Sequence, residues 1–333
     1  MYETINSPIN YGGLELKNRI IFAPTTFGLA EDEYFEKIRK IAAGGCAMVI
    51  IGDVPVGKSQ FEKSLFDKKG FAHYQKLVEI VHSYDCRICA QLHQSDSNML
   101  AMLKYVPGVL TKKISMEELR PLLNAEVAPY ISKLSTRKIH KIINGFGEAA
   151  VLAVKAGFDM VQVHGDRMCG SFSSTIFNHR TDEYGGSLEN RLRFAREIVE
   201  EIKKTCGADF PVALRFSPKS MIKDWREGAL PGEEFAEKGR DMEEGLEAAK
   251  LLISYGYDAL DVDVGSYDSW WWSHPPMYQK KGLYRKYAKA IKEVVDVPVL
   301  AAGRMDDPDL AAQALRDGRC DMIGLARPLL TEP

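Results

Sequence analysis

The sequence predicts an α/β protein built as a (β/α)8 TIM barrel, and three observations support this prediction. Four segments, 42–52, 155–165, 254–265 and 316–327, repeat the order of helix end, glycine and short apolar strand. Glycine ends a helix where a positive φ is needed, and the apolar run after it is typical of a strand buried on both faces of a parallel sheet. Helical patterns alternate with these strands, and the eight candidate strands are the number that closes such a barrel.

The candidate strands follow one another at 19–24, 47–52, 87–93, 159–164, 211–217, 258–265, 298–303 and 321–326. Between them, the clearest helical patterns cover 188–206 and 242–255. The competing architecture is a doubly wound open sheet, whose first strand–helix turn would normally carry a dinucleotide-type glycine fingerprint. Residues 23–34 contain none. We therefore treat 1–333 as one barrel domain, preceded by an N-terminal hairpin.

Two connections are irregular. The segment from Gln94 to Thr136, after the third strand, is too long for an ordinary βα loop, so we expect a lid or an interface excursion above the active face. The loop from Gly265 to Gly282 contains three consecutive tryptophans. Both connections leave the carboxyl ends of strands, where parallel α/β proteins hold their ligands.

The composition excludes several classes of partner. A net charge of -2 gives no electrostatic footprint for nucleic acid or an anionic membrane. We find neither an apolar run long enough to span a bilayer nor the pattern of a signal peptide, and so expect a cytoplasmic protein. We also expect a small-molecule substrate and a homo-oligomer. The six cysteines have no zinc-finger or disulfide-rich spacing; Cys86 and Cys89 could form a redox or metal pair, but we favour core thiols and expect no metal.

The segment 158–194 concentrates polar chemistry at the end of one strand. The apolar alternation of 159–163 ends in His164, and Asp166, Arg167 and Cys169 follow within five positions. For an isolated histidine the ordinary interpretation is a buried side chain with satisfied hydrogen bonds. The surrounding residues favour a group that faces a ligand instead.

The same segment resembles the old yellow enzyme superfamily, in particular its branch of 2,4-dienoyl-CoA reductase-like NADH:flavin oxidoreductases. The resemblance rests on His164-Gly165 and on the run 180–191. Further matches stand in family order at 16–26, 90–94, 213–218, 301–305 and 324–330, and so span nearly the whole chain. Within 180–191, Ser187 and the charged residues after it also read as a helix cap and first turn, so we interpret this run as a structural signature.

The resemblance implies a barrel that binds FMN and takes electrons from NADH or NADPH. In such relatives the barrel is often followed by an iron-sulfur cluster and a pyridine-nucleotide domain. The chain ends at Pro333, shortly after the eighth strand. We therefore expect the barrel part of a longer native protein, in which an iron-sulfur cluster and FAD would belong only to the longer chain.

Several residues match positions that hold the flavin in this family. Gly303 and Arg304, with Ala326 and Arg327, follow the seventh and eighth strands, where such barrels bind phosphate. Arg215 lies in an apolar strand and needs a polar partner, which is either the flavin or a salt bridge to Asp261 or Asp263. The remaining matches are Gln91 for the pyrimidine edge and Ala23, Pro24, Thr25 and Gly52 along the ring.

Two of the residues expected to bind the substrate differ from those of the family. In relatives, the histidine at the position of His164 acts with a second His or Asn three positions later, and a Tyr five positions later often donates a proton. Here Arg167 and Cys169 stand at those positions. An arginine can polarise a carbonyl or hold a carboxylate, so the substrate prediction shifts towards acids. Cys169 is equally well interpreted as a proton donor or as a packed small side chain.

The tryptophan loop offers further ligand contacts. Trp270 and Trp271 would be costly to expose and suit a flat apolar or cationic ligand, although packing against the long excursion explains one or two of these rings equally well. Tyr267, His274 and Tyr278 are replacement proton donors. We therefore expect an apolar or aromatic substrate with a carbonyl or carboxylate.

These observations favour an FMN-dependent oxidoreductase that reduces an activated C=C bond (an enone, enoate or enoyl thioester) by hydride transfer from flavin N5. The catalytic candidates are His164, Arg167 and Cys169. One alternative keeps the flavin and oxidises an amine, as amine dehydrogenases or demethylases of the superfamily do. Another, from a different class, is a flavin-free barrel that binds a phosphorylated ligand through Arg304 and Arg327.

Overall fold

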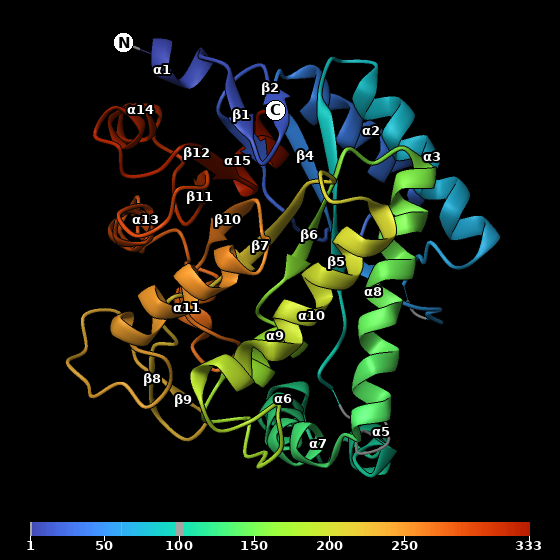
Figure 1. The fold of residues 1–333 in the computed structure, drawn as a ribbon, viewed down its shortest axis with the longest axis vertical. Helices are drawn as coiled ribbons and strands as arrows, with labels where there is room; N and C mark the ends of the chain where they lie inside the picture. The colour runs from blue at the N-terminus through green and yellow to red at the C-terminus, as the bar shows by residue number, and fades with distance from the viewer. Residues whose placement is uncertain (1, 61, 98–102) are drawn as a thin grey trace.

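A computed structural model describes residues 2–60, 62–97 and 103–333. Eight parallel strands form a closed barrel in the order β3-β4-β5-β6-β7-β10-β11-β12, with β12 pairing back to β3. The predicted (β/α)8 barrel is confirmed, and the open-sheet alternative is wrong because the first and last barrel strands are hydrogen-bonded neighbours. Figure 1 shows the longer helices lying around the barrel.

The barrel strands are β3 Ile20–Phe22, β4 Met48–Pro55, β5 Arg87–His93, β6 Met160–His164, β7 Val212–Phe216, β10 Ala259–Val262, β11 Val299–Ala301 and β12 Met322–Leu325. The other strands are β1 Ile9–Tyr11, β2 Leu14–Leu16, β8 Ile222–Asp224 and β9 Glu227–Gly228. The helices are α1 Glu3–Asn6, α2 Glu31–Ala43, α3 Lys68–His82, α5 Val106–Leu110, α6 Met116–Ala125, α7 Val127–Lys133, α8 Thr136–Ala156, α9 Met168–Ser173, α10 Leu188–Cys206, α11 Met242–Ser254, α12 Trp270–Ser273, α13 Arg285–Lys292, α14 Pro308–Arg316 and α15 Arg327–Thr331.

Local signals in the sequence set where helices begin and end. The Ser187 hydroxyl accepts from the Asn190 N–H and caps α10, which covers the predicted range 188–206. At the other end of a helix, Gly157 follows α8 with a φ of 98°, a conformation that glycine adopts without a Cβ penalty. The chain then enters β6, as the repeated helix–glycine–strand order predicts.

The predicted N-terminal hairpin is present, and it closes one end of the barrel. Strands β1 and β2 pair antiparallel, and Tyr11 and Leu16 are almost fully buried. These two side chains belong to the core cluster inside the barrel, with residues from the strands such as Met48, Met160 and Met322. A second and larger cluster fills the layer between the strands and the outer helices. The hairpin therefore contributes directly to the interior core.

The long connection after β5 forms the helices α5, α6 and α7, while its residues 98–102 lie outside the described part of the chain. Figure 1 shows these helices at the opposite end of the molecule from the β1–β2 hairpin. Arg226, in the β8–β9 hairpin, donates to the Pro121 carbonyl of α6. This contact joins two excursions that arise from different strands, β5 and β7.

The run 180–191 is structural, as its sequence predicts. The Arg180 guanidinium pairs with Asp182 and donates to the carbonyls of Ile131 and Leu134 at 2.7 and 2.6 Å. Arg191 binds both carboxylate oxygens of Glu244, on α11. The run 180–191 therefore holds the long connection after β5 and helix α11 against the segment before α10.

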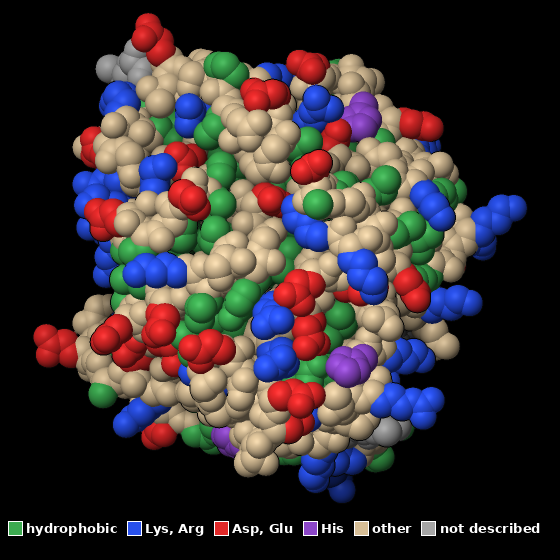
Figure 2. Space-filling view, in the orientation of Figure 1, with side chains coloured by type: hydrophobic (Ala, Val, Ile, Leu, Met, Phe, Trp, Pro, Cys, Tyr) green, Lys and Arg blue, Asp and Glu red, His purple; other side chains and the backbone are tan. Residues whose placement is uncertain are grey.

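The surface agrees with the small net charge. Figure 2 shows acidic and basic side chains intermingled over the face in view. Among the described helices, none combines the length and the apolar character that crossing a bilayer requires. Cys86 and Cys89 are both buried, and the thiol nearest to Cys86 is that of Cys46, with 3.8 Å between the two sulfurs.

Candidate functional site

The predicted cofactor residues come together at the carboxyl ends of the strands. Ala23, Pro24 and Thr25 follow β3, and Gly52 lies near the end of β4, where a Cβ would come within 3.4 Å of Pro24 and Thr25. The set is completed by Gln91 in β5, Arg215 in β7, Gly303 and Arg304 after β11, and Ala326 and Arg327 after β12. The barrel thus gathers on one rim residues that are far apart in sequence.

The turn after β11 has an unusual backbone. Gly303 and Arg304 both have positive φ angles, 73° and 60°. A Cβ on Gly303 would lie 2.5 Å from the Tyr284 ring, so this position requires glycine. A non-glycine residue in the left-handed region is uncommon and often marks a functional turn. The Arg304 guanidinium pairs with Asp306, with 2.9 Å between Nε and a carboxylate oxygen.

Arg304 and Arg327 converge on the segment 275–279. Arg304 donates to the carbonyls of residues 276, 277 and 279, the first at 3.1 Å and the last at 2.8 Å. Arg327 donates to the Pro275 carbonyl at 2.6 Å. Two guanidinium groups from neighbouring strand ends thus meet at one place, and a phosphate there would compete with these carbonyls for the same donors.

Arg215 forms the salt bridge that the sequence offered as an alternative to the flavin. Its Nε lies 2.8 Å from an oxygen of Asp263 and 3.0 Å from an oxygen of Asp166. Burial raises the pKa of Asp166, and the neighbouring carboxylate of Asp263 raises it further, whereas Arg215 opposes the shift. One guanidinium between two carboxylates leaves the cluster with an excess of acidic groups.

A chain of buried amides reaches from β5 to β10. Gln91 Nε2 donates to Gln162 Oε1 at 2.6 Å, and Gln162 Nε2 donates to Asp261 Oδ2 at 3.2 Å. All three residues are at most 4% exposed. Burial raises the pKa of Asp261 to about 6, against the effect of Arg215. Asp261 therefore sets the orientation of Gln162, which in turn sets that of the Gln91 amide.

The chemistry of this rim fits FMN. Two guanidinium groups suit its phosphate, and Gln91 and Arg215 offer an amide and a cation to its polar ring edge. In addition, Arg167 Nε is a buried donor that has no hydrogen-bond partner among the described residues. A buried donor of this kind is usually satisfied by a ligand or by water.

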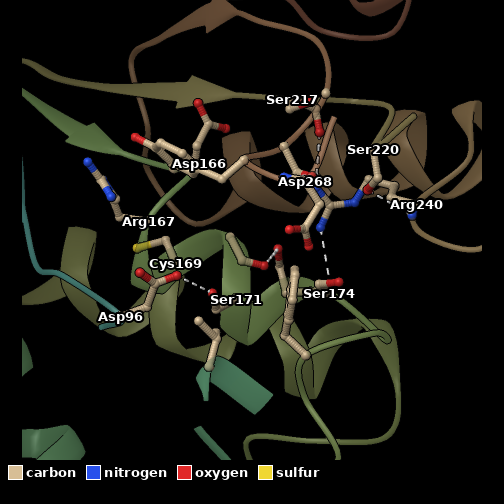
Figure 3. A pocket seen from close by; sticks show the side chains of 18 of the residues that line it. Asp96, Asp166, Arg167, Cys169, Ser171, Ser174, Ser217, Ser220, Arg240 and Asp268 are labelled. Atoms are coloured by element: carbon tan, nitrogen blue, oxygen red, sulfur yellow. Dashed lines mark hydrogen bonds between the residues drawn. The ribbon is translucent and has the colours of Figure 1, made fainter. Parts of the chain in front are cut away.

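A cavity of about 710 Å³ opens around the carboxyl ends of β6, β7 and β10, and neither His164 nor the candidate flavin residues are among the described residues that line it. Asp166, Arg167 and Cys169 line it, and so do Tyr267 and Trp270 from the tryptophan loop. Leu119, Leu123 and Val127 contribute apolar wall from the long excursion, as a lid would. Figure 3 shows Arg167, Cys169 and Asp166 on one side of the cavity.

The residues after β6 have distinct environments. His164 is 6% exposed, and burial, together with Arg215 and Arg167, holds the pKa of its imidazole well below the ordinary value. Its Nδ1 accepts from the Asp166 N–H at 3.3 Å, so the neutral ring carries its proton on Nε2. Cys169 is 5% exposed and part of the core, and burial raises the pKa of its thiol. It is therefore a packed thiol that also lines the cavity.

The tryptophan loop divides its aromatic rings among three environments. Trp270 lines the cavity and stacks on His274 with 3.7 Å between ring centroids. The Arg167 guanidinium lies 4.2 Å from the centre of the Tyr267 ring, a cation–π contact. Trp271 is 44% exposed and is not among the cavity-lining residues, nor is His274. The indole of Trp272 donates to the Ala229 carbonyl and anchors the loop.

Some cavity residues have no clear signal in the sequence. Ser171 donates to Asp96 at 2.6 Å, and this pair joins α9 to the segment after β5. Arg240 lines the opposite side of the cavity from Arg167, as Figure 3 shows. Its position directly before the Asp241 N-cap of α11 reads as an ordinary helix start. Asp166 lies within the predicted cluster, and its acidic character beside Arg167 could have indicated a role.

Comparisons with known proteins agree with this geometry. Residues 4–333 match the model of the NADH:flavin oxidoreductase / NADH oxidase family. A cinnamate reductase of Clostridium sporogenes is 45% identical over 99% of this chain and 52% of its own length. A bilirubin reductase of Clostridium symbiosum is 43% identical over 100% of this chain and 88% of its own length. A solved complex of 2-naphthoyl-CoA reductase with 2-naphthoyl-CoA superposes with a TM-score of 0.76 at 23% identity, over 98% of this chain and 50% of that one.

The chain spans about half the length of several curated relatives that it matches, including the cinnamate reductase. The bilirubin reductase of Clostridium symbiosum differs in this respect, because the chain covers most of it. The similarity thus extends over the whole barrel described above.

Proposed function

Because this chain belongs to the NADH:flavin oxidoreductase / NADH oxidase family, we propose that it is an FMN-dependent reductase of activated C=C bonds whose substrate carries a carboxylate. When bound, FMN would supply hydride to the β carbon of the alkene, with NADH or NADPH as the electron donor. Arg304 and Arg327 would hold its phosphate, and Gln91 and Arg215 would contact the ring edge. A homo-oligomer stays a prediction, which light scattering tests.

The observation that carries this proposal is Arg167 in the wall of a cavity of about 710 Å³. Its Nε is buried and lacks a hydrogen-bond partner among the described residues, and its guanidinium is held against Tyr267. Such a group binds a carboxylate by charge-assisted hydrogen bonds. The relatives named cinnamate reductase and bilirubin reductase support, as the substrate class, a carboxylic acid that contains a conjugated system.

His164 has a second role in this proposal. Since its Nδ1 accepts from the Asp166 N–H, its Nε2–H is the atom that can donate to a substrate carbonyl or carboxylate oxygen. The depressed pKa keeps the ring neutral at physiological pH, so it donates without an added charge. His164 and Arg167 together would polarise the conjugated system and orient it for hydride transfer.

The proton that the α carbon takes up after hydride transfer has two candidate donors. Burial raises the pKa of the Cys169 thiol, so it stays protonated but is a weak acid. Burial raises the pKa of Tyr267 to about 12, while Arg167 opposes this shift. Tyr267 lines the cavity and resembles in chemistry the tyrosine that relatives use. We favour Tyr267 as the donor over Cys169.

A stopped-flow experiment tests the proposal. Protein reduced by NADH is mixed with cinnamate, with a neutral enone of similar size, with an enoyl thioester and with buffer, and the return of the flavin absorbance is followed. We expect cinnamate to reoxidise the flavin faster than buffer does. No acceleration by cinnamate, enones or enoyl thioesters would contradict reduction of activated alkenes, and reduction of the flavin by a tertiary amine would favour the amine dehydrogenase alternative. A protein that stays colourless after incubation with FMN would exclude both flavin functions.

A substitution at Arg167 tests whether this residue binds the substrate carboxylate. Arg167→Ala should weaken carboxylate substrates by about 10-fold or more, the effect of losing hydrogen bonds to a charged group, and should change neutral enones much less. The control is Arg196→Ala, on the outer face of α10, where the guanidinium pairs with Glu200. Equal losses for acids and neutral enones would assign Arg167 to the scaffold instead.

A further inference from the structure

A second buried arginine lines the cavity at a distance from Arg167. Arg240 is 8% exposed and lies on the other side of the cavity in the view of Figure 3. Its guanidinium lies 5.3 Å from the centre of the Phe216 ring, at the end of β7. The two guanidinium groups therefore face one continuous space from separate elements.

The charge of Arg240 is only partly compensated. Its Nε is 3.5 Å from Glu244 Oε1, too long for a well-formed hydrogen bond. Arg191 holds both oxygens of that same carboxylate, at 3.0 and 2.7 Å. Two guanidinium groups thus share one carboxylate, and an arginine remains charged even where burial disfavours the cation. One positive charge is in excess within this trio.

The other hydrogen bonds of Arg240 go to neutral carbonyl groups. It donates to the Ser217 carbonyl at 3.1 Å and to the Ser173 carbonyl at 3.4 Å. Ser174 and Ser220 add polar lining to the same part of the cavity. Asp268 also lines the cavity.

We propose that Arg240 and the serines around it form a second carboxylate subsite, and that the substrate is an extended conjugated dicarboxylate held by Arg167 at one acid group and by Arg240 at the other. This inference rests on the proposed function for the identity of the cavity as the substrate site. A cavity of about 710 Å³ is large enough for a ligand well beyond the size of cinnamate. The subsite makes Arg240 a determinant of specificity that does not contact the reacting bond.

The wild-type protein alone tests the proposal. Bilirubin, its monomethyl ester and its dimethyl ester carry two, one and no free carboxylates on the same conjugated skeleton. Their dissociation constants for the oxidised FMN-loaded protein are measured by calorimetry without NADH. We expect each esterification to weaken binding by about tenfold or more, because each removes one charged hydrogen-bond partner. Equal affinity of the diacid and the monoester would overturn the second subsite.

Variants then locate the second subsite. Arg240→Met keeps the length of the side chain without its charge, and we expect it to bind the diacid and the monoester equally well. The control Arg196→Met should keep the wild-type preference. A preference for the diacid that survives in a folded Arg240→Met protein would overturn the assignment to Arg240.

The two proposals fail in different ways. If cinnamate and other monocarboxylates reoxidise the flavin but the ester series binds uniformly, the reductase stands and the second subsite falls. If the ester series is graded but no alkene reoxidises the flavin, the subsite stands and the reductase activity falls. Should Arg240→Met not fold, which its melting temperature reveals, the ester series with wild-type protein still decides.

Discussion

Replacement of Asp261 by asparagine should stabilise the barrel at neutral pH and have little effect in acid. Asp261 is 4% exposed, at the end of the amide chain that begins at Gln91, and its carboxylate accepts from Gln162 Nε2. An asparagine has nearly the same shape and keeps an oxygen that can accept from Gln162. The substitution therefore removes the ionisable group while it preserves the hydrogen bond.

The direction and size of the change in the free energy of unfolding follow from the pKa of Asp261. Burial raises the pKa of Asp261 from 3.8 to about 6, with Arg215 opposing the shift. As pH rises above 3.8, the unfolded chain releases this proton first, so the native state loses stability up to about pH 6 and no more above it. A difference of two pKa units corresponds to about 3 kcal/mol. The free energy of unfolding of Asp261→Asn, relative to that of the wild type, should therefore be up to about 3 kcal/mol higher at pH 7.5 than at pH 4.

The assay is unfolding by urea at pH 4 and at pH 7.5, for the wild type and for Asp261→Asn in parallel. The relevant quantity is the difference between the two proteins in their free energy of unfolding at each pH. The control is Asp209→Asn, which makes the same substitution at an exposed position.

Two outcomes would refute this reasoning. If the difference between Asp261→Asn and the wild type is the same at both pH values, Asp261 does not titrate with a raised pKa. If the variant is less stable at pH 7.5, the negative charge of Asp261 stabilises the fold through Arg215 by more than its burial costs.

The remaining predictions concern other parts of the molecule. The sulfurs of Cys46 and Cys86 are 3.8 Å apart, so a mild thiol oxidant should join them in a disulfide that mass spectrometry detects as the loss of two hydrogens. Cys86→Ala should abolish this product and Cys89→Ala should not; the same product in both variants would contradict the pairing. FMN phosphate should displace the carbonyls of residues 276, 277 and 279 from Arg304 and that of Pro275 from Arg327. Hydrogen exchange of the segment 275–279 should therefore change on addition of FMN, and unchanged exchange would place the phosphate elsewhere.

The periodicity of the sequence was sufficient for the barrel. A helix end, a glycine and a buried strand are local features, because φ angles and apolar runs depend on residues that are close in sequence. Gly157 with its positive φ and the Ser187 cap show how local these signals are. The prediction of α10 over 188–206 needed no knowledge of its neighbours.

The resemblance to a family also allowed the rim residues to be predicted, and the barrel geometry places these residues at strand ends. It did not decide the partners of the charged groups. The sequence left Arg215 with either the flavin or a salt bridge to Asp261 or Asp263, and in the structure it pairs with Asp263 and also with Asp166. The second partner arises because β6 and β7 are adjacent, so the segment after β6 meets the end of β7.

The sequence by itself determined the fold and the family. It also determined the strand end at which the substrate-binding residues differ from those of relatives. Only the tertiary structure decided which charges face the cavity. Arg240 shows why: its contacts to Ser217 and Glu244 lie within its own β7–α11 unit, but the contact to Ser173 reaches α9, which follows β6. Ion pairs and cavities depend on distances across the barrel, and no local pattern encodes those distances.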